Sequence, residues 1–242
     1  MPIPDFTTLA KRAGKLDIAL EIRRHRGPID VVVDSTGLKV FGEGELKMRQ
    51  HGKGKRRTWR RVHLAVNPQT QEIVAPTLTD NSSDDAGQVD PLLDQAPKKV
   101  RKLYGDGAYD QQKVYDTWQR RGVVAIIPHR RNARIQRHGN YAGVGLARDM
   151  AIRQIRDLGR RRSKERVGYH RRSLSETAIY RMKCSFGGCL KNPRLGNQQT
   201  EVRLRSKILN TSPTSASLSS SGVSQQGHCG VFLPEISLTA WE

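Results

Sequence analysis

A short run of β-branched residues constrains the fold of this chain most strongly. Residues 29–33 read Ile-Asp-Val-Val-Val, and such a run is typical of a strand buried inside a sheet. Asp34 follows directly, and Gly37 comes three residues later. We therefore expect a central strand that ends at Asp34 and carries a carboxylate at its edge. In the alternative interpretation, Asp34 only opens an Asx-turn ahead of Gly37.

Four further segments have strand character and place this strand in a mixed sheet. Residues 61–67 and 72–79 predict a hairpin, which would form an antiparallel meander with the first strand. Residues 100–104 and 123–127 flank a helical segment, and this order predicts a parallel pair with a right-handed crossover. The predicted fold class is therefore α/β, with three antiparallel strands, further parallel strands and flanking helices.

The segment GDGAYD, residues 105–110, closes the strand at 100–104. Glycines on both sides of Asp106 let the backbone turn sharply and leave the carboxylate accessible. Asp106 is therefore a second candidate for a functional carboxylate. The alternative is an ordinary turn aspartate.

The stretch from Tyr169 to Lys183 predicts a helix with two distinct stripes. At ~100° per residue, one stripe is polar, and it consists of Tyr169, Arg172, Glu176 and Lys183. A neighbouring stripe is apolar and suited to packing against a sheet, and it consists of Leu174, Ala178 and Met182. In the alternative interpretation, Ser173 and Glu176 form a capping box at a helix start.

Positive charge dominates the composition. The chain has 43 Lys and Arg against 23 Asp and Glu, a formal net charge of +20. This balance predicts a polyanionic partner, bound largely through phosphate and with strong salt dependence, although a merely solvated basic surface is the alternative. Basic residues are dense at 51–61, 129–137 and 153–172. The first cluster lies in a glycine-rich segment, and its DNA-binding candidates are Lys53, Lys55, Arg56 and Arg57.

Several other classes of protein are not supported. The three cysteines, Cys184, Cys189 and Cys229, are odd in number and lack paired CxxC spacing, which argues against a structural zinc site or a disulfide framework. No run approaches the ~20 apolar residues of a membrane span, and the N-terminus has no secretory signal. We expect a soluble, cytoplasmic protein without membrane partners.

The predicted topology can bring three carboxylates together. Asp34 follows the first strand, Asp106 follows the strand at 100–104, and Glu176 lies on a helix beside the sheet. Three carboxylates without His or Cys form a hard-oxygen site suited to Mg²⁺ or Mn²⁺. Such a site can hold two ions ~4 Å apart, which clamp the attacking and leaving oxygens of a phosphodiester.

These motifs resemble the DDE transposases of bacterial insertion sequences, in the branch that includes the insertion sequence five group. The resemblance covers residues 1 to about 210 and rests on four segments: VVVDSTGLKVFGEGE, KRRTWRRVHLAVN, YGDGAYD and GYHRRSLSETAIYRMK. The last segment contains the spacing of the Y-R-E-K signature, with Tyr169, Arg172, Glu176 and Lys183.

The resemblance implies a ribonuclease H-like catalytic core with Asp34, Asp106 and Glu176 as metal-binding triad. It implies that Tyr169, Arg172 and Lys183 contact phosphates near the transposon end. In the family, metal-activated water cuts the strand, and the freed 3′-hydroxyl attacks target DNA. Transposon ends and target DNA are the implied partners, and a homodimer on paired ends is the implied assembly, associated with the bacterial nucleoid.

The resemblance also suggests a domain organisation. We expect a helical N-terminal remnant at 1–26, a catalytic domain at 27–210 with a basic insertion near 129–165, and a disordered Ser-rich tail at 211–242. Relatives usually carry an N-terminal helical DNA-binding region, so a truncated copy is expected. Two other functions stay open: a non-catalytic basic DNA-binding remnant, and a general ribonuclease H-like nuclease that cuts without sequence preference.

Overall fold

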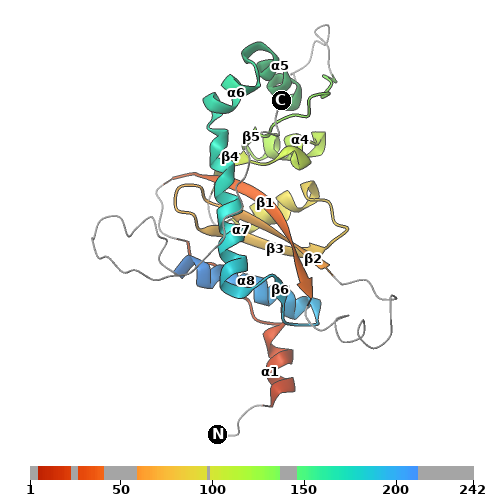
Figure 1. Ribbon diagram of the computed structural model, residues 1–242, viewed down its shortest axis with the longest axis vertical. Helices are drawn as coiled ribbons and strands as arrows, with labels where there is room; N and C mark the ends of the chain where they lie inside the picture. The colour runs from red at the N-terminus through yellow and green to blue at the C-terminus, as the bar shows by residue number, and fades with distance from the viewer. Residues whose placement is uncertain (1–4, 23–26, 41–58, 97–98, 137–145, 212–242) are drawn as a thin grey trace, which may run out of the picture. The chain divides into compact units, whose positions relative to one another are not determined.

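The computed structural model describes residues 5–22, 27–40, 59–96, 99–136 and 146–211. Within these ranges, five strands form a sheet in the order β3-β2-β1-β4-β5, and the short β6 also pairs with β1 (Figure 1). The strands are β1 (Ile29–Val40), β2 (Trp59–Val66), β3 (Ile73–Asp80), β4 (Val100–Tyr104), β5 (Val124–Ile126) and β6 (Cys189–Leu190).

Helices connect and flank these strands. The α-helices are α1 (Phe6–Ala13), α3 (Val89–Gln95), α4 (Gln112–Arg120), α5 (Ala147–Leu158), α6 (Arg160–Val167), α7 (Ser173–Phe186) and α8 (Leu195–Thr211). Three short 3₁₀ helices occur at Ala86–Gln88, Gly107–Tyr109 and Tyr169–Arg172. Among the residues described, no helix combines the length and apolar character that a membrane crossing requires.

The sheet is mixed, as predicted. The pairs β1–β2 and β2–β3 are antiparallel, whereas β1–β4 and β4–β5 are parallel. The two antiparallel pairs form the predicted meander, and α4 provides the predicted crossover between β4 and β5. The predicted fold class is therefore confirmed.

The two faces of the sheet carry separate apolar cores. Val31 and Val33 of β1 pack with a cluster that includes residues of α3 and α4. Leu38 belongs to a second cluster with residues of α7 and α8, and Figure 1 shows α7 crossing the sheet. Successive strand residues point to opposite faces, so β1 supplies both cores, with Val31 and Val33 on one face and Leu38 on the other. The result is a three-layer arrangement in which β1 is central.

Strand β1 does not end at Asp34, so that prediction was wrong. With β4, the last parallel pair is Val32 with Tyr104, and further along β1 the short β6 pairs with Lys39 and Val40. On the β2 side, pairing continues from Asp34 with Leu64 to Lys39 with Trp59. Pairing of β1 with β2 thus continues beyond the residue at which pairing with β4 ends. Asp34 lies in the middle of a strand, at the point where its parallel neighbour has turned away.

The helix predicted from Tyr169 to Lys183 begins later in the structure. Before it, the basic segment forms two helices, α5 and α6, which are separated by Gly159, whose φ of +78° favours glycine. Tyr169 to Arg172 form a 3₁₀ turn after Gly168, and α7 begins only at Ser173. The polar residues from Tyr169 to Lys183 therefore do not lie on one continuous α-helix.

The N-terminal segment packs against the last described helix. The Asn197 side-chain amide of α8 donates a hydrogen bond of 3.0 Å to the Ala10 carbonyl of α1. Lys207 of α8 also lies 3.3 Å from the Glu21 carboxylate. The predicted Ser-rich tail lies outside the described residues, apart from Thr211 at the end of α8.

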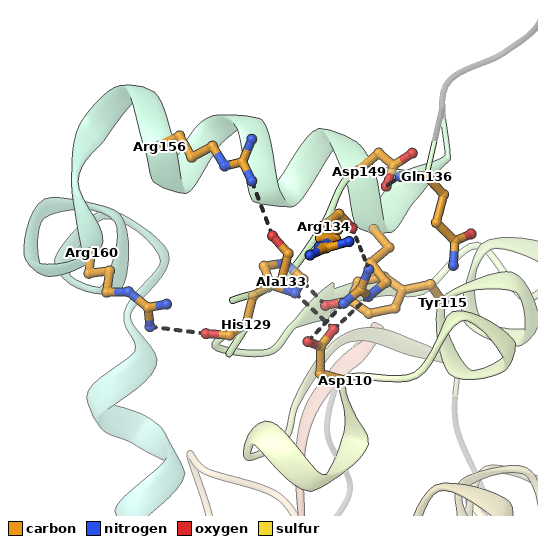
Figure 2. Close-up of polar contacts among 10 residues, drawn as sticks. Asp110, Tyr115, His129, Ala133, Arg134, Gln136, Asp149, Arg156 and Arg160 are labelled. Atoms are coloured by element: carbon orange, nitrogen blue, oxygen red, sulfur yellow. Dashed lines mark hydrogen bonds and ion pairs between the residues drawn. The ribbon is translucent and has the colours of Figure 1, made fainter. Parts of the chain in front are cut away.

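A buried ionic group attaches the basic segment near 129–165 to the sheet. Asp110, which precedes α4, accepts hydrogen bonds from Arg148 of α5 at 2.8 and 3.1 Å. His129 Nδ1 lies 2.9 Å from the same carboxylate, and it must carry the proton because an ionised carboxylate only accepts (Figure 2). Burial alone would raise the pKa of Asp110, but the bonds from His129 and Arg148 outweigh it and hold the pKa well below its usual range.

We expect Asp110→Asn to lower the free energy of unfolding by about 2–3 kcal/mol at pH 7, because Arg148 loses a buried charged partner. A carboxylate with a depressed folded-state pKa stabilises the protein above its unfolded-state pKa of ~3.9 and loses this effect as the pH falls. Urea unfolding between about pH 7 and pH 3 should therefore show the difference from the parent protein shrinking below about pH 4. A difference independent of pH would contradict this assignment.

Candidate active site

The parallel register of β1 and β4 brings two of the predicted carboxylates to one place. Val32 pairs with Tyr104, and Asp34 and Asp106 each lie two residues further along. The backbone turns at Gly105, where an added Cβ would meet the Tyr109 ring at 3.0 Å. Asp106 Oδ1 then accepts a 2.8 Å hydrogen bond from the Ala108 N–H, as a turn aspartate would. Its side chain is still 39% exposed, so the carboxylate remains accessible.

Asp34 is held firmly by its neighbours. Its Oδ1 accepts a 2.8 Å hydrogen bond from the Ser35 N–H, and its Oδ2 accepts one of 3.1 Å from Ser175 Oγ of α7. Burial raises the pKa of Asp34, and the negative charge of Asp106 raises it further. The Ser35 and Ser175 bonds and the charge of Arg172 oppose this rise. Asp34 therefore sits in a place where additional positive charge would be favourable.

A single guanidinium joins all three predicted carboxylates. Arg172 Nη1 lies 2.6 Å from Glu176 Oε1, one turn further along in α7. Its Nη2 lies 3.8 Å from Asp34 Oδ2 and 3.9 Å from Asp106 Oδ2. The capping box considered from the sequence does not form, because Ser173 Oγ donates to the His170 carbonyl and Glu176 pairs with Arg172. The structure thus brings Asp34, Asp106 and Glu176 around one positive centre.

The donor set at this centre is chemically suited to a hard divalent cation. Carboxylate oxygens are the ligands that Mg²⁺ and Mn²⁺ prefer, and these three converge on a shared counter-charge. In the arrangement around Arg172, the described residues contain no group of three or more His, Cys, Asp or Glu that could hold a metal ion. The Arg172 guanidinium is the counter-ion of the three carboxylates in this structure.

Tyr169 lies beside this cluster. Burial raises the pKa of its phenol to about 12, with Asp106, Asp34 and Glu176 raising it and Arg172 lowering it. The phenol is therefore neutral at pH 7 and can donate a hydrogen bond to an anionic ligand. Lys164 Nζ of α6 lies 5.4 Å from the centre of the Tyr169 ring, within the range of a cation–π contact.

Two models of protein families match this chain. A family model described as a transposase DDE domain matches residues 25–210, which is most of the chain. The chain belongs to the DDE transposase family. A second model with the same description matches residues 1–43. The mixed sheet and its flanking helices agree with the ribonuclease H-like fold of DDE transposases.

The other predicted site residues of this transposase do not lie at the carboxylate cluster in the described part of the chain. Lys183 is exposed on α7, seven residues beyond Glu176 and thus about two helical turns away from the carboxylates. It is on the same side of α7 as Glu176 by spacing, but it makes no ion pair with the cluster. Four predicted DNA-binding residues lie outside the described part of the chain, namely Lys53, Lys55, Arg56 and Arg57.

Two residues near the three carboxylates were not predicted from the sequence. Ser175 directly precedes Glu176 and donates to Asp34, so α7 fixes two carboxylates at once. The Tyr109 hydroxyl is buried without a hydrogen-bond partner among the described residues. Burial raises the pKa of Tyr109 well above its usual value, and Asp85, Asp34 and Asp106 raise it further. The sequence signal that could have identified Tyr109 was its position in GDGAYD, three residues after Asp106.

Proposed function

We propose that this DDE transposase belongs to the insertion sequence five group and catalyses cleavage and strand transfer of its element's DNA. Its Y-R-E-K signature consists of Tyr169, Arg172, Glu176 and Lys183. The observation that carries the proposal is the convergence of Asp34, Asp106 and Glu176 from β1, the end of β4 and α7 upon one guanidinium. The family match over residues 25–210 supports the same chemistry.

Asp34, Asp106 and Glu176 would hold Mg²⁺ or Mn²⁺, with two ions expected from the reaction. Bound ions would activate the attacking oxygen and stabilise the leaving oxygen of an in-line displacement at phosphorus. The protein residues position this chemistry. Ser35 and Ser175 fix the Asp34 carboxylate, and the turn at residues 105–109 fixes Asp106. Hydrolysis of the strand and attack by its 3′-hydroxyl share this geometry, so one site serves both steps.

The cationic and phenolic residues of the site would bind the DNA backbone. Tyr169 donates from a neutral phenol, and Arg172 and Lys183 supply positive charge toward phosphate. The basic segment at residues 51–61 would add sequence-independent contacts through Lys53, Lys55, Arg56 and Arg57. Residues 27–210 would form the catalytic domain, acting as a homodimer on paired transposon ends at the nucleoid.

The experiment that tests this proposal is an assay of the purified protein on a labelled duplex of its own element's end, with Mn²⁺ present or chelated. We expect nicking at the element boundary only with metal, followed by joining of the 3′ end to a target plasmid. Cleavage of unrelated duplexes at the same rate without joining would favour a general nuclease. Binding without any metal-dependent cleavage would favour the non-catalytic remnant.

A prediction follows for Arg172, because this residue now balances the charge that a metal would balance. We expect Arg172→Gln to increase the stabilisation by Mn²⁺, since the variant's carboxylates lack their counter-ion. The measurement is the rise in Tm between chelator and excess Mn²⁺ without DNA. Arg171→Gln is the matched control, because Arg171 pairs with Asp30 and not with the three carboxylates. Equal rises in the two variants would contradict the prediction.

A further inference from the structure

A pocket lined with arginine lies in the basic segment, between the loop after β5 and the helices α5 and α6. Its volume is about 250 Å³. The loop contributes Arg130 and Arg131, α5 contributes Arg156, and α6 contributes Arg160. None of the nine residues that line the pocket is acidic. Four arginines therefore line one cavity, and none of its lining residues carries a carboxylate.

Two of these arginines are held in place by neutral partners. Arg156 Nη2 donates a 3.1 Å hydrogen bond to the Ala133 carbonyl, and Arg160 Nη1 donates one of 3.0 Å to the His129 carbonyl (Figure 2). Each guanidinium has five N–H donors, and a carbonyl uses one of them while leaving the positive charge unbalanced. The arginines are therefore oriented by the loop, with donors left over for an anion.

Two acidic groups of this region are bound to other partners. Asp110 is occupied by His129 and Arg148, and Asp149 accepts from the Gln136 N–H (Figure 2). Within the described ranges, the side chains of Arg130 and Arg131 form no ion pair. Four like charges around one cavity repel one another, and an anion bound between them would relieve that repulsion.

A second, smaller cavity lies between the arginine pocket and Tyr169. This cavity of about 60 Å³ shares Ile155 with the arginine pocket and is also lined by Lys164 and Tyr169. Tyr169 in turn lies beside the three carboxylates, whose charges raise its pKa. Tyr169 thus lies beside both the three carboxylates and the smaller cavity, and Ile155 lines both cavities.

We infer that the arginine pocket is a second phosphate-binding site, which holds a backbone phosphate of the same DNA strand whose reacting phosphate lies at the carboxylates. Guanidinium groups bind phosphate oxygens through paired N–H bonds, and a carbonyl-oriented guanidinium loses less entropy when it does so. The inference rests on the proposed function for the identity of the strand. The binding chemistry itself requires only a phosphodiester and the four arginines.

The test is fluorescence anisotropy of a labelled end duplex in chelator, at several NaCl concentrations between about 50 and 200 mM. Two double variants remove the pocket charges, Arg130→Gln with Arg131→Gln and Arg156→Gln with Arg160→Gln. Each should raise Kd about tenfold and reduce the slope of log Kd against log salt by about 1. Arg156→Lys with Arg160→Lys should keep part of the affinity that the glutamine variant loses, because the charges remain without the paired geometry.

The matched control is Arg120→Gln with Arg162→Gln, which removes the same charge from exposed residues of α4 and α6 that do not line the pocket. We expect its Kd to change by less than about threefold. Equal losses in control and pocket variants would overturn the inference, because they would indicate a diffuse charge effect. Unchanged binding in the Arg130 and Arg131 variant would also overturn it, since these exposed loop residues can be replaced without loss of the fold.

Two further measurements distinguish a DNA phosphate from free phosphate as the ligand, and binding at the pocket from cleavage at the carboxylates. Inorganic phosphate should raise Tm by much less than the end duplex does. If phosphate raises the Tm of the parent protein but not of the pocket variants, and the variants bind DNA as tightly as the parent, the pocket is a site for free phosphate instead. In chelator, Asp34→Asn should show the same pocket-dependent loss of binding as the parent protein. Failure of cleavage would therefore reject the catalytic proposal alone, whereas failure of these binding differences would reject the pocket.

Discussion

Asp34→Asn, Asp106→Asn and Glu176→Gln are each expected to slow metal-dependent cleavage of transposon-end DNA by roughly 10³-fold or more. Each amide keeps the size of the carboxylate but removes a negative charge from the group around Arg172. Loss of any one ligand weakens the hold on both proposed ions. The three single variants should therefore have similar effects, and combining them should add little.

The measurement is the single-turnover rate of end cleavage with Mg²⁺ or Mn²⁺, with anisotropy used in parallel for binding. DNA affinity in chelator should stay within about threefold of the parent protein, because the net charge of the surface becomes only slightly more positive. Asp116→Asn provides the control, since this exposed carboxylate of α4 accepts a bond from Gln112 and lies outside the cluster. Full cleavage in all three site variants would reject the triad.

Trp118→Ala is expected to lower the free energy of unfolding by about 3–5 kcal/mol, the largest effect on stability in the described core. The indole is fully buried on α4, and it packs in the apolar cluster that joins α3 and α4 to the sheet. Tyr115 lies one turn earlier, with its ring centre 6.3 Å away. Truncation would leave a cavity between α4 and the sheet, next to the crossover that connects β4 with β5.

Trp118→Phe separates the loss of volume from the loss of the indole N–H. The Nε1 atom is buried without a hydrogen-bond partner among the described residues, so its removal breaks no bond. The phenylalanine variant should therefore lose only on the order of 1–2 kcal/mol. Urea unfolding followed by far-UV circular dichroism measures both. A loss below about 1 kcal/mol for the alanine variant would contradict the packing of α4 against the sheet.

Much of the sheet could be predicted from the sequence because its strands carry local signals. The β-branched run that became β1, and the hairpin of β2 and β3, depend on residues close together in the chain. The vicinity of Asp34 and Asp106 could also be predicted, because β1 and β4 are parallel and each aspartate lies two residues beyond the pair of Val32 with Tyr104. The full length of β1 could not be predicted, since it depends on pairing with β2 beyond the last residue of β4.

The details of the site were harder to predict, because they depend on tertiary contacts. The helical spacing of Tyr169 and Arg172 suggested one helix, whereas the left-handed Gly168 leads into a 3₁₀ turn before α7. The central place of Arg172 arises from carboxylates on three separate elements. No local pattern encodes such an arrangement. The roles of Asp34, Asp106 and Glu176 as metal ligands stay a prediction.

The most direct measurement is anomalous diffraction at the manganese edge from crystals of the protein with Mn²⁺ and an end duplex. We predict anomalous peaks between the carboxylates of Asp34, Asp106 and Glu176, with the Arg172 guanidinium displaced from its position among them. Well-ordered manganese bound only elsewhere, with Arg172 still paired to all three carboxylates in the DNA complex, would contradict a metal-dependent transposase site at this centre.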